Sequence, residues 1–402
     1  MSNLKKYRFC DLYTMSSGIS STKEQAGHGN PFLSFSVVFN NYFVPDELTD
    51  LMSISDKEKE TYSIKSGDIF LTRTSEVVDE LAMSCVAIKE YPNASYSGFL
   101  KRLRPTQTDI TYSKFMAFYL RSPMFRKTMT NNAVMTLRAS LNEAIFSYLD
   151  LLLPDFDDQV KAGDLLYLLS EKIELNNRIN AELEVMAKTV YDYWFVQFDF
   201  PDANGKPYKT SGGKMIYNPT LKREIPEGWE VVPVGDYANV KKGTLITEKD
   251  ANQHGNIKVV SAGLNYSYLH DEANYSANVI TISASGASAG FINFWREPIF
   301  ACDCTVVKGN SDEETIYLLN FLKMRQEFIY QQARGSAQPH VYPKDISALN
   351  IEVPPKGLLE KFKAHVLDGN SEISNRLLQN QKLAVLRDWL LPMLMNGQVT
   401  VK

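Results

Sequence analysis

The chain carries two divergent copies of one pattern, and this internal duplication constrains its fold more than any other feature. The first half contains Asp11, Gly18, Lys23-Glu24 and Gly29-Asn30, and the second half contains Asp236, Gly243, Glu248-Lys249 and Gly255-Asn256 in the same order. Further along, Leu149–Pro154 (LDLLLP) returns as Leu349–Pro354 (LNIEVP). A period near half the chain is too long for a solenoid, whose repeats span about 20–50 residues. The duplication therefore predicts two copies of one unit, each a β-rich domain followed by a helix.

Each copy continues into a long polar segment with an apolar stripe at spacings of three and four, the period of an amphipathic helix. The first stripe contains Leu165, Leu169, Ile173, Asn176, Ile179, Leu183, Met186, Val190 and Tyr193, and the second contains Phe362, Val366, Ile373 and Leu377, with Asn380 along it. A buried asparagine in such a seam fixes register and partner at a cost in stability. We expect the two helices to pair antiparallel, as in a coiled coil, with Asn176 and Asn380 setting the register. The alternative is that each helix packs only on its own domain.

The remaining sequence favours β structure with some helix. The strand candidates are Ile69–Thr72, Ser84–Ile88, Gly98–Leu103, Asn278–Ser285, Gly290–Trp295 and Pro298–Val307. Residues 112–129 have helical spacing, which Pro123 should interrupt or restart. The sequence thus predicts an α+β fold with a pseudo-twofold internal repeat. Its predicted parts are β-rich domains at 1–153 and 227–353, helical regions at 154–195 and 354–402, and a turn-rich linker at 196–226.

Composition excludes several classes of protein. The chain has 402 residues, 44% hydrophobic and 22% charged, which is typical of a folded soluble protein. It has neither an apolar run of the roughly 18–20 residues that spans a bilayer nor a secretory signal, so we expect a cytoplasmic location. The four cysteines, Cys10, Cys85, Cys302 and Cys304, lack metal-ligand spacing, which favours reduced thiols over a metal site. The net charge of −4 argues against a stand-alone electrostatic DNA clamp, but a local basic face remains compatible with it.

Motifs of bond chemistry are missing from the sequence. Ser211–Lys214 lacks the first glycine and the strand of a P-loop, and no GxGxxG follows a predicted strand. Asn30-Pro31-Phe32 lacks the second proline with which amino-methyltransferases hold a target amine. Asp202 and Lys206 fall in a turn, and no histidine pair has metal-ligand spacing on one helix. The sequence therefore predicts no catalytic residue, no metal and no cofactor bound by this chain.

Another set of side chains could meet DNA phosphates or base edges through charge and hydrogen bonds. The candidates are Arg73, Lys101, Arg102, Arg104, Arg138, Lys241, Lys242, Ser283, Ser285, Ser288 and Gln338. Each basic residue alone is more typical of a solvated surface, whereas the set together is what a phosphate-facing side requires. The segment from Ser283 to Gly290 could be a tight hairpin without a ligand.

Several segments resemble the specificity subunits of type I restriction–modification systems. The strongest are Lys172–Lys214, which is similar to the central conserved region of that family, and Leu386–Gly397 (LRDWLLPMLMNG), which is similar to its C-terminal end. Within the second domain, Glu224–Glu230, Val260–Gly263, Ile282–Gly286, Gly290-Phe291 and Gly335–Pro339 resemble a target recognition domain. The first domain matches loosely, and the segments after Pro154 and Pro354 depart from the family's usual Pro-x-x-x-Glu-Gln ending.

The resemblance implies a non-catalytic subunit for DNA recognition in host defence. Each recognition domain would read one half of a bipartite double-stranded DNA site, and the helices would bind two methyltransferase subunits. The partners would hold S-adenosylmethionine for adenine N6 methylation, and restriction subunits would cleave with ATP and Mg²⁺. Helices of roughly 30–35 residues would separate the readers by about 45–52 Å, or about 13–15 base pairs. The alternatives are a scaffold or inhibitory protein of the same fold and, less favoured, a stand-alone nuclease or methyltransferase.

Overall fold

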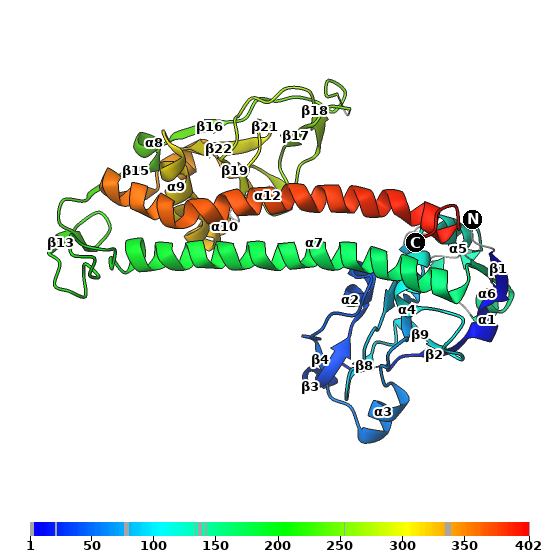
Figure 1. Cartoon of the computed structure of the whole chain (residues 1–402). Helices are drawn as coiled ribbons and strands as arrows, with labels where there is room; N and C mark the ends of the chain where they lie inside the picture. Colours follow the sequence, from blue (N-terminus) through cyan, green and yellow to red (C-terminus); the bar gives the residue numbers. More distant parts are fainter. Residues whose placement is uncertain are drawn as a thin grey trace. The chain divides into compact units, whose positions relative to one another are not determined.

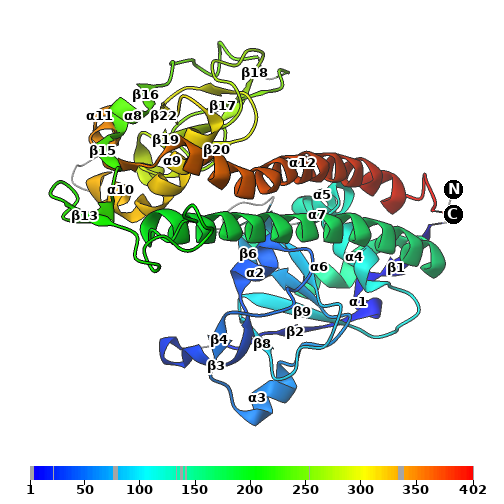
Figure 2. The ribbon, with the colours of Figure 1, turned by 60° about the vertical axis from the view of Figure 1, so that its left-hand side comes forward.

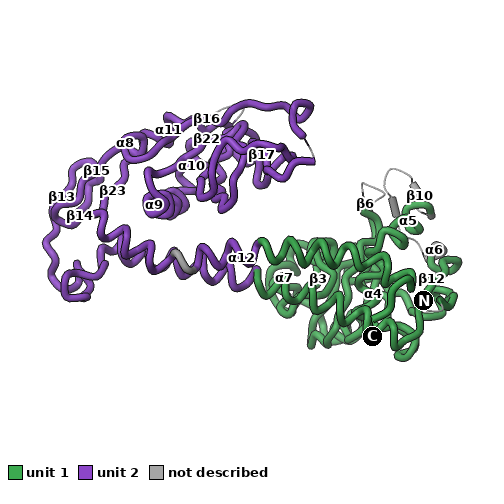
Figure 3. Tube along the Cα trace, turned by 45° about the horizontal axis from the view of Figure 1, so that its top comes forward, with its two compact units in different colours: residues 1–176, 378–402 green, residues 177–377 purple. Residues whose placement is uncertain are grey.

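The chain forms two compact units (Figure 3). The computed structural model describes residues 4–20, 22–75, 80–132, 134–135, 139–140, 143–252, 254–333 and 339–401. Unit 1 comprises residues 1–176 and 378–402, and unit 2 comprises residues 177–377. Each unit contains one β-rich region and part of each of two long helices, α7 (Phe156–Tyr191) and α12 (Lys356–Met395). Helices and sheets are mixed in both units, which confirms the α+β class.

Unit 1 contains an antiparallel four-stranded sheet in the order β2-β9-β5-β7. A second sheet, β4-β3-β8, has one parallel pair, and β1 pairs with β12. A small sheet has the order β10-β11-β6. The strands are β1 Lys5–Arg8, β2 Tyr13–Ser17, β3 Ala26–Leu33, β4 Leu51–Met52, β5 Ile69–Thr72, β6 Thr74–Ser75, β7 Ser84–Val86, β8 Ser95–Tyr96, β9 Leu100–Pro105, β10 Val134–Met135, β11 Ala139–Ser140 and β12 Asp150–Leu153. The helices are α1 Phe9–Leu12, α2 Phe35–Asn40, α3 Asp56–Thr61, α4 Ser113–Tyr119, α5 Pro123–Asn132 and α6 Glu143–Tyr148. The predicted restart at Pro123 is confirmed, because α5 begins there.

Unit 2 has sheets of the same order, β16-β22-β19-β20, β18-β17-β21 and β15-β23, with β17 and β21 again the parallel pair. A separate hairpin joins β13 and β14. The strands are β13 Met215–Asn218, β14 Arg223–Pro226, β15 Glu230–Pro233, β16 Asn239–Lys242, β17 Ile257–Val260, β18 Tyr268–His270, β19 Val279–Ser283, β20 Ile292–Trp295, β21 Ile299–Ala301, β22 Cys304–Lys308 and β23 Asn350–Val353. The helices are α8 Val234–Tyr237, α9 Asp312–Met324, α10 Gln326–Ala333 and α11 Pro343–Ser347.

The echoed glycines mark close backbone approaches in both units. A Cβ on Gly18 would lie 2.2 Å from the Ser97 carbonyl oxygen, and a Cβ on Gly243 would lie 2.1 Å from the Cys302 carbonyl oxygen. Both glycines follow the edge strand of the four-stranded sheet. Each donates its N–H to the carbonyl oxygen of the first residue of the neighbouring strand in the sheet, Leu100 of β9 or Cys304 of β22. Only glycine fits such an approach, which explains why this residue recurs in both halves.

The two long helices run antiparallel where they meet within each unit (Figures 1 and 2). In unit 1, the Asn176 amide donates to the side-chain oxygens of Gln379 and Asn380 at 2.8 Å each. In unit 2, Tyr191 packs on Phe362 at a ring-centroid distance of 6.2 Å. The structure thus brings together the two asparagines that the sequence suggested as register residues.

The seam of α7 departs from the predicted stripe after Asn176. The predicted seam residues Met186, Tyr193 and, on α12, Leu377 are 61%, 39% and 42% exposed. The buried positions are instead Asn180, Tyr191 and Trp194. The prediction was wrong at Met186, Tyr193 and Leu377, because counting apolar residues skipped the polar Asn180, whereas Leu183 and Val190 are partly buried as predicted.

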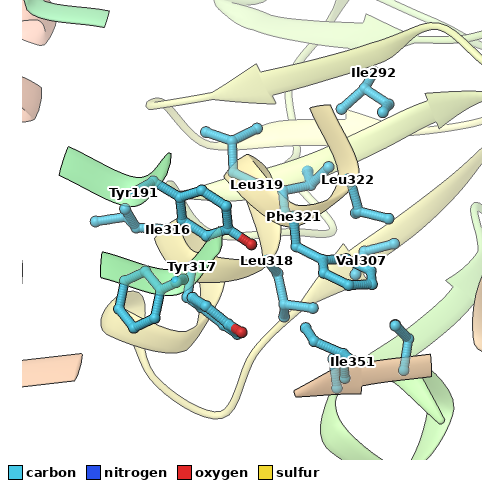
Figure 4. Close-up of a cluster of buried hydrophobic side chains, with 14 of the residues drawn as sticks. Tyr191, Ile292, Val307, Ile316, Tyr317, Leu318, Leu319, Phe321, Leu322 and Ile351 are labelled. Atoms are coloured by element: carbon cyan, nitrogen blue, oxygen red, sulfur yellow. The ribbon is translucent and has the colours of Figure 1, made fainter. Parts of the chain in front are cut away.

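Each unit has one large apolar core of its own. In unit 1, α4 and α5 pack on the sheet together with Leu166 of α7 and Leu391 and Leu394 of α12. In unit 2, Figure 4 shows α9 side chains such as Phe321 and Leu318 packed toward Val307 and Ile351 of the strands. Burying side chains of this size stabilises a fold by about 1.5–3 kcal/mol each.

The stretch 196–226, predicted as a linker, is folded. Phe198, Phe200 and Trp229 are buried together, with Phe200 and Trp229 stacked at 5.4 Å. The hairpin β13–β14 follows, and the Asp199 carboxylate accepts hydrogen bonds from Thr210. Turn residues did predict the bends, but the aromatic residues between them build a small core that a turn count does not reveal.

Candidate nucleic-acid interface

Some of the interface candidates lie at one end of each four-stranded sheet, where three connections meet, whereas Arg102 lies inside β9 and Arg104 lies toward its other end. In unit 1 the three connections are the residues after β2, after β5 and before β9. In unit 2 they are the residues after β16, after β19 and before β22. The registers Thr72↔Leu100 and Ser283↔Cys304 place these ends in equivalence, as do Ser17↔Lys101 and Lys242↔Thr305. We call these two ends rim 1 and rim 2.

Rim 1 contains an exposed arginine and an exposed phenylalanine whose backbones are hydrogen-bonded to each other. Arg73 is exposed, and its backbone N–H donates to the Phe99 carbonyl at 2.9 Å. Phe99 is 66% exposed. Lys101 is buried, and its ammonium group donates to the Ser17 hydroxyl at 2.8 Å. Rim 1 therefore offers one cationic and one apolar side chain to a ligand.

Rim 2 presents a polar cluster on the same frame. Asp303 accepts a hydrogen bond from the Ser285 hydroxyl at 3.3 Å, and the Lys242 ammonium group lies 3.7 Å from its carboxylate. Lys241 and Lys242 are exposed on the edge strand β16, where lysines also protect an edge from pairing with another chain. Rim 2 therefore combines hydroxyl, ammonium and carboxylate groups.

Two of the predicted basic residues, Arg102 and Arg104, form hydrogen bonds with other residues of unit 1. Arg104 makes a two-pronged ion pair with the fully buried Asp68, at 2.7 and 2.6 Å. The hydrogen bond to Asp68 raises the pKa of Arg104, whereas burial lowers the pKa of Arg102. Arg102 donates to the Ser63 carbonyl at 2.8 Å and lies over the Tyr96 ring. This placement favours a structural role for both arginines.

The predicted serines have different surroundings. Ser283 is 2% exposed, so its hydroxyl is out of reach of a ligand. Ser285 and Ser288 are partly exposed, and Ser288 ends a 3-10 turn (Gly286–Ser288) between β19 and β20. The Gln326 side chain holds that connection by donating to the Gly290 carbonyl and accepting from the Ile292 N–H. The tight connection that the sequence left open is present, with Ser285 at its accessible start. Arg138 and Gln338 lie outside the described residues.

Sequence reasoning missed Phe99 and Asp303. Phe99 lies near the start of the predicted strand Gly98–Leu103, and Asp303 lies inside the predicted strand Pro298–Val307, which the structure divides into β21 and β22. Only the strand registers Thr72↔Leu100 and Ser283↔Cys304 place these residues at equivalent positions, because the two halves differ in length between the echoed glycines and these strands. The search for basic residues passed over them because neither carries a positive charge.

No metal site is visible among the residues that the structure describes, since they contain no group of three His, Cys, Asp or Glu side chains suited to an ion. Burial raises the pKa of the Cys85 and Cys304 thiols to about 12, which favours neutral thiols over metal ligands. The described part of the chain also contains no helix both long and apolar enough to cross a membrane.

The long helices expose apolar side chains that no described residue covers. On α12, a shallow groove of about 380 Å³ is lined by Leu378, Gln381, Lys382, Val385, Leu386 and Trp389. Val385 is 70% exposed and Trp389 is 62% exposed. On α7, Leu168 is 62% exposed. Exposed apolar surface of this kind is typical of a protein–protein interface.

Comparisons with known proteins agree with this arrangement. The family model of the type I restriction modification DNA specificity domain matches residues 1–185 and 226–386. A specificity subunit of the type I restriction enzyme MjaIX from Methanocaldococcus jannaschii is 23% identical over 354 residues, covering 83% of this chain and 79% of that protein. The HindI specificity subunit from Haemophilus influenzae is 22% identical and covers 99% of this chain and 100% of that protein.

A solved structure shows the same fold. The type I restriction–modification S subunit from M. genitalium superposes with a TM-score of 0.62 at 16% identity, covering 98% of this chain and 96% of that one. The family match favours DNA recognition over a scaffold that does not read DNA, and over an enzyme. The chain therefore belongs to the family of specificity subunits of type I restriction–modification systems, whose role is DNA recognition and not catalysis.

Proposed function

We propose that the two units are duplicated target recognition domains, each reading one half of a bipartite DNA site. The observation that carries this proposal is the identical order of strands in the two units, combined with different side chains at rim 1 and rim 2. Because the order of strands is shared, both units could approach the major groove in the same way. Because the side chains at the two rims differ, each unit could recognise a different base sequence.

The long helices would act as a spacer and as a docking surface for two methyltransferase subunits. The apolar groove around Trp389 and the exposed Leu168 support a protein partner on these helices. The partners would carry S-adenosylmethionine for adenine methylation, and restriction subunits would bring ATP and Mg²⁺. This chain would supply the groups that read the DNA sequence and the surface that binds the partners, and the partners would supply the catalytic groups.

A paired deletion tests the spacer role. Because Asn176 of α7 contacts Gln379 and Asn380 of α12, one helix cannot be shortened alone without misaligning the seam. We therefore remove one heptad from each helix, Ile173–Ile179 and Leu377–Leu383, which deletes the contacting polar residues together. At about 1.5 Å per residue, the loss is roughly 10.5 Å, or about three base pairs.

The expected result is a methylation motif with unchanged half-sites and a spacer shortened by about three base pairs. The measurement is methylome sequencing of cells that express the variant with its partner subunits. Deleting the α7 heptad alone serves as a control and should abolish methylation. An unchanged spacer or altered half-sites in the paired variant would disprove the spacer role.

A further inference from the structure

Phe99 and Asp303 occupy the same position in the two units. In unit 1, the Ser97 N–H donates to the last residue of β3 and the Gly18 N–H donates to the first residue of β9. In unit 2, the Cys302 N–H donates to the last residue of β17 and the Gly243 N–H donates to the first residue of β22. Phe99 directly precedes Leu100, and Asp303 directly precedes Cys304. Equivalent bonds thus flank both residues, but the segment between those bonds is one residue longer in unit 1, where Gly98 also precedes Phe99. The two residues are therefore equivalent when counted from the start of β9 and β22.

These backbone hydrogen bonds place the Phe99 and Asp303 side chains at the end of the four-stranded sheet in each unit. The Phe99 carbonyl accepts from the Arg73 N–H, so the ring leaves a pinned backbone and yet stays 66% exposed. The carboxylate of Asp303 is oriented by Ser285 and Lys242, at 3.3 and 3.7 Å, and its side chain remains 32% exposed. Pinned and exposed groups of this kind lose little conformational entropy when they bind a ligand.

The chemistry of the two positions is opposite. A carboxylate near DNA is repelled by phosphates, so its favourable partner is a base-edge amino group, and cytosine N4 is the usual donor to Asp or Glu. An exposed phenyl ring cannot hydrogen-bond, and its favourable partner in the major groove is the thymine methyl group. The two residues therefore suit different base pairs at equivalent places in the two half-sites.

We propose that Phe99 and Asp303 are equivalent specificity-determining residues, Phe99 contacting a thymine methyl in the first half-site and Asp303 accepting from a cytosine N4 amine in the second. This inference rests on the proposed function, in which each unit reads one half-site. Lys242 and Ser285 are positioning residues for Asp303, because they act by holding its carboxylate.

The test uses the full complex of this chain with its methyltransferase partners and methylome sequencing of each variant. Phe99→Ala should relax one thymine position of the first half-site, lowering discrimination there about tenfold, with the second half-site unchanged. Asp303→Asn should relax one cytosine position of the second half-site by a similar factor and leave the first unchanged.

Two matched controls separate base reading from general effects. Leu152→Ala removes a 43% exposed apolar side chain on β12 of unit 1. Glu297→Gln removes a carboxylate that also pairs with a lysine, Lys258 at 2.5 Å, but lies at the opposite end of the sheet strands. Both variants should keep the wild-type motif.

The outcomes distinguish this inference from the proposed function. Active variants with the wild-type motif would overturn the roles of Phe99 and Asp303 and leave the two-reader account standing. A relaxed position in the other half-site would also overturn them. A wild-type motif that is not bipartite would instead disprove the proposed function. If a variant loses methylation, the affinity of the complex is measured for two oligonucleotides that differ at one base pair. The ratio of the two affinities then measures discrimination at that position, and a ratio equal to that of the wild type counts against the inference.

Discussion

The two units attach their long helices through ion pairs of opposite polarity. In unit 1, Lys114 of α4 pairs with Asp164 of α7 at 2.9 Å. In unit 2, Glu313 of α9 pairs with Lys363 of α12 at 2.5 Å. The helices α4 and α9 follow equivalent strands, and α7 and α12 follow β12 and β23, so the contacts are in equivalent places. Each domain is therefore matched in charge to its own helix, because exchanging the helices would place Lys114 against Lys363 and Glu313 against Asp164.

The interiors of the units differ as well. The position of the buried Asp68 in unit 1 is taken by Val279 in unit 2, because Ile69 pairs with Leu103 as Ile280 pairs with Val307. Arg102 is likewise replaced by Val306. At these positions unit 1 has a charged network and unit 2 has an apolar cluster. The shared strand order therefore does not depend on this network, whereas the neighbouring positions Ile69 and Ile280 are buried in the apolar core of both units.

The largest loss of stability is expected from substitutions of Gly18 and Gly243, the glycines at the close backbone approaches. Gly18→Ala should destabilise unit 1 by at least about 4 kcal/mol, because its Cβ would overlap the Ser97 carbonyl oxygen at 2.2 Å. Hydrogen exchange should show opening of unit 1 while unit 2 stays protected, and Gly243→Ala should give the reverse. Gly357→Ala, which meets nothing within 4 Å, is the control and should be neutral. Equal opening of both units by either glycine variant would contradict the independence of the two frames.

A smaller effect is expected from the charged interior of unit 1. Asp68→Ala leaves Arg104 without its carboxylate partner, and removing one member of a buried pair costs about 3 kcal/mol. Urea unfolding followed in unit 1 measures the loss. The surface pair of Asp46, whose side chain is 86% exposed, provides the control, since Asp46→Ala should change stability little. If Asp68→Ala were as mild as Asp46→Ala, the buried network would not be what stabilises unit 1.

The smallest effect concerns the attachment of unit 2 to its helix. Hydrogen bonds from Lys363 and Ser311 lower the pKa of Glu313 to about 2. Because the folded pKa is depressed, the pair stabilises the fold fully above the ordinary glutamate pKa, and this contribution is lost as pH falls toward 2. Glu313→Gln should lower stability at pH 7 by about 1.5 kcal/mol and flatten the acid side of the stability curve.

Thermal unfolding between pH 2 and 7 provides that measurement, with Lys114→Met in unit 1 as the comparison. Both variants remove one charge of an attachment pair. A Glu313→Gln curve parallel to the wild type throughout this range would show that the pair adds nothing to the folded state.

The sequence predicted the elements well where local patterns decide them. The strands near Ile69, Val279 and Cys304 and the long helices follow from alternation, turn residues and helical spacing. The seam after Asn176 could not be predicted, because the choice of Asn180 over Ile179 depends on the partner helix. The roles of Arg102 and Arg104 could not be predicted either, because Asp68 comes close to them only when β5 pairs with β9.

The candidate interface was predictable only in part. Positive charge drew attention to Arg73 and Lys242, which the structure places at the rims, and also to Lys101, which it buries. Phe99 and Asp303 emerge only after the strand registers align the two units, because their shared position is a property of pairing and not of composition.

We propose that this chain contains two separate readers of DNA, and methylome sequencing of cells that express it with its methyltransferase partners tests this proposal. Two readers should give adenine methylation within two short specified segments that are separated by an unspecified spacer. A single continuous recognition sequence, or methylation without sequence preference, would contradict it.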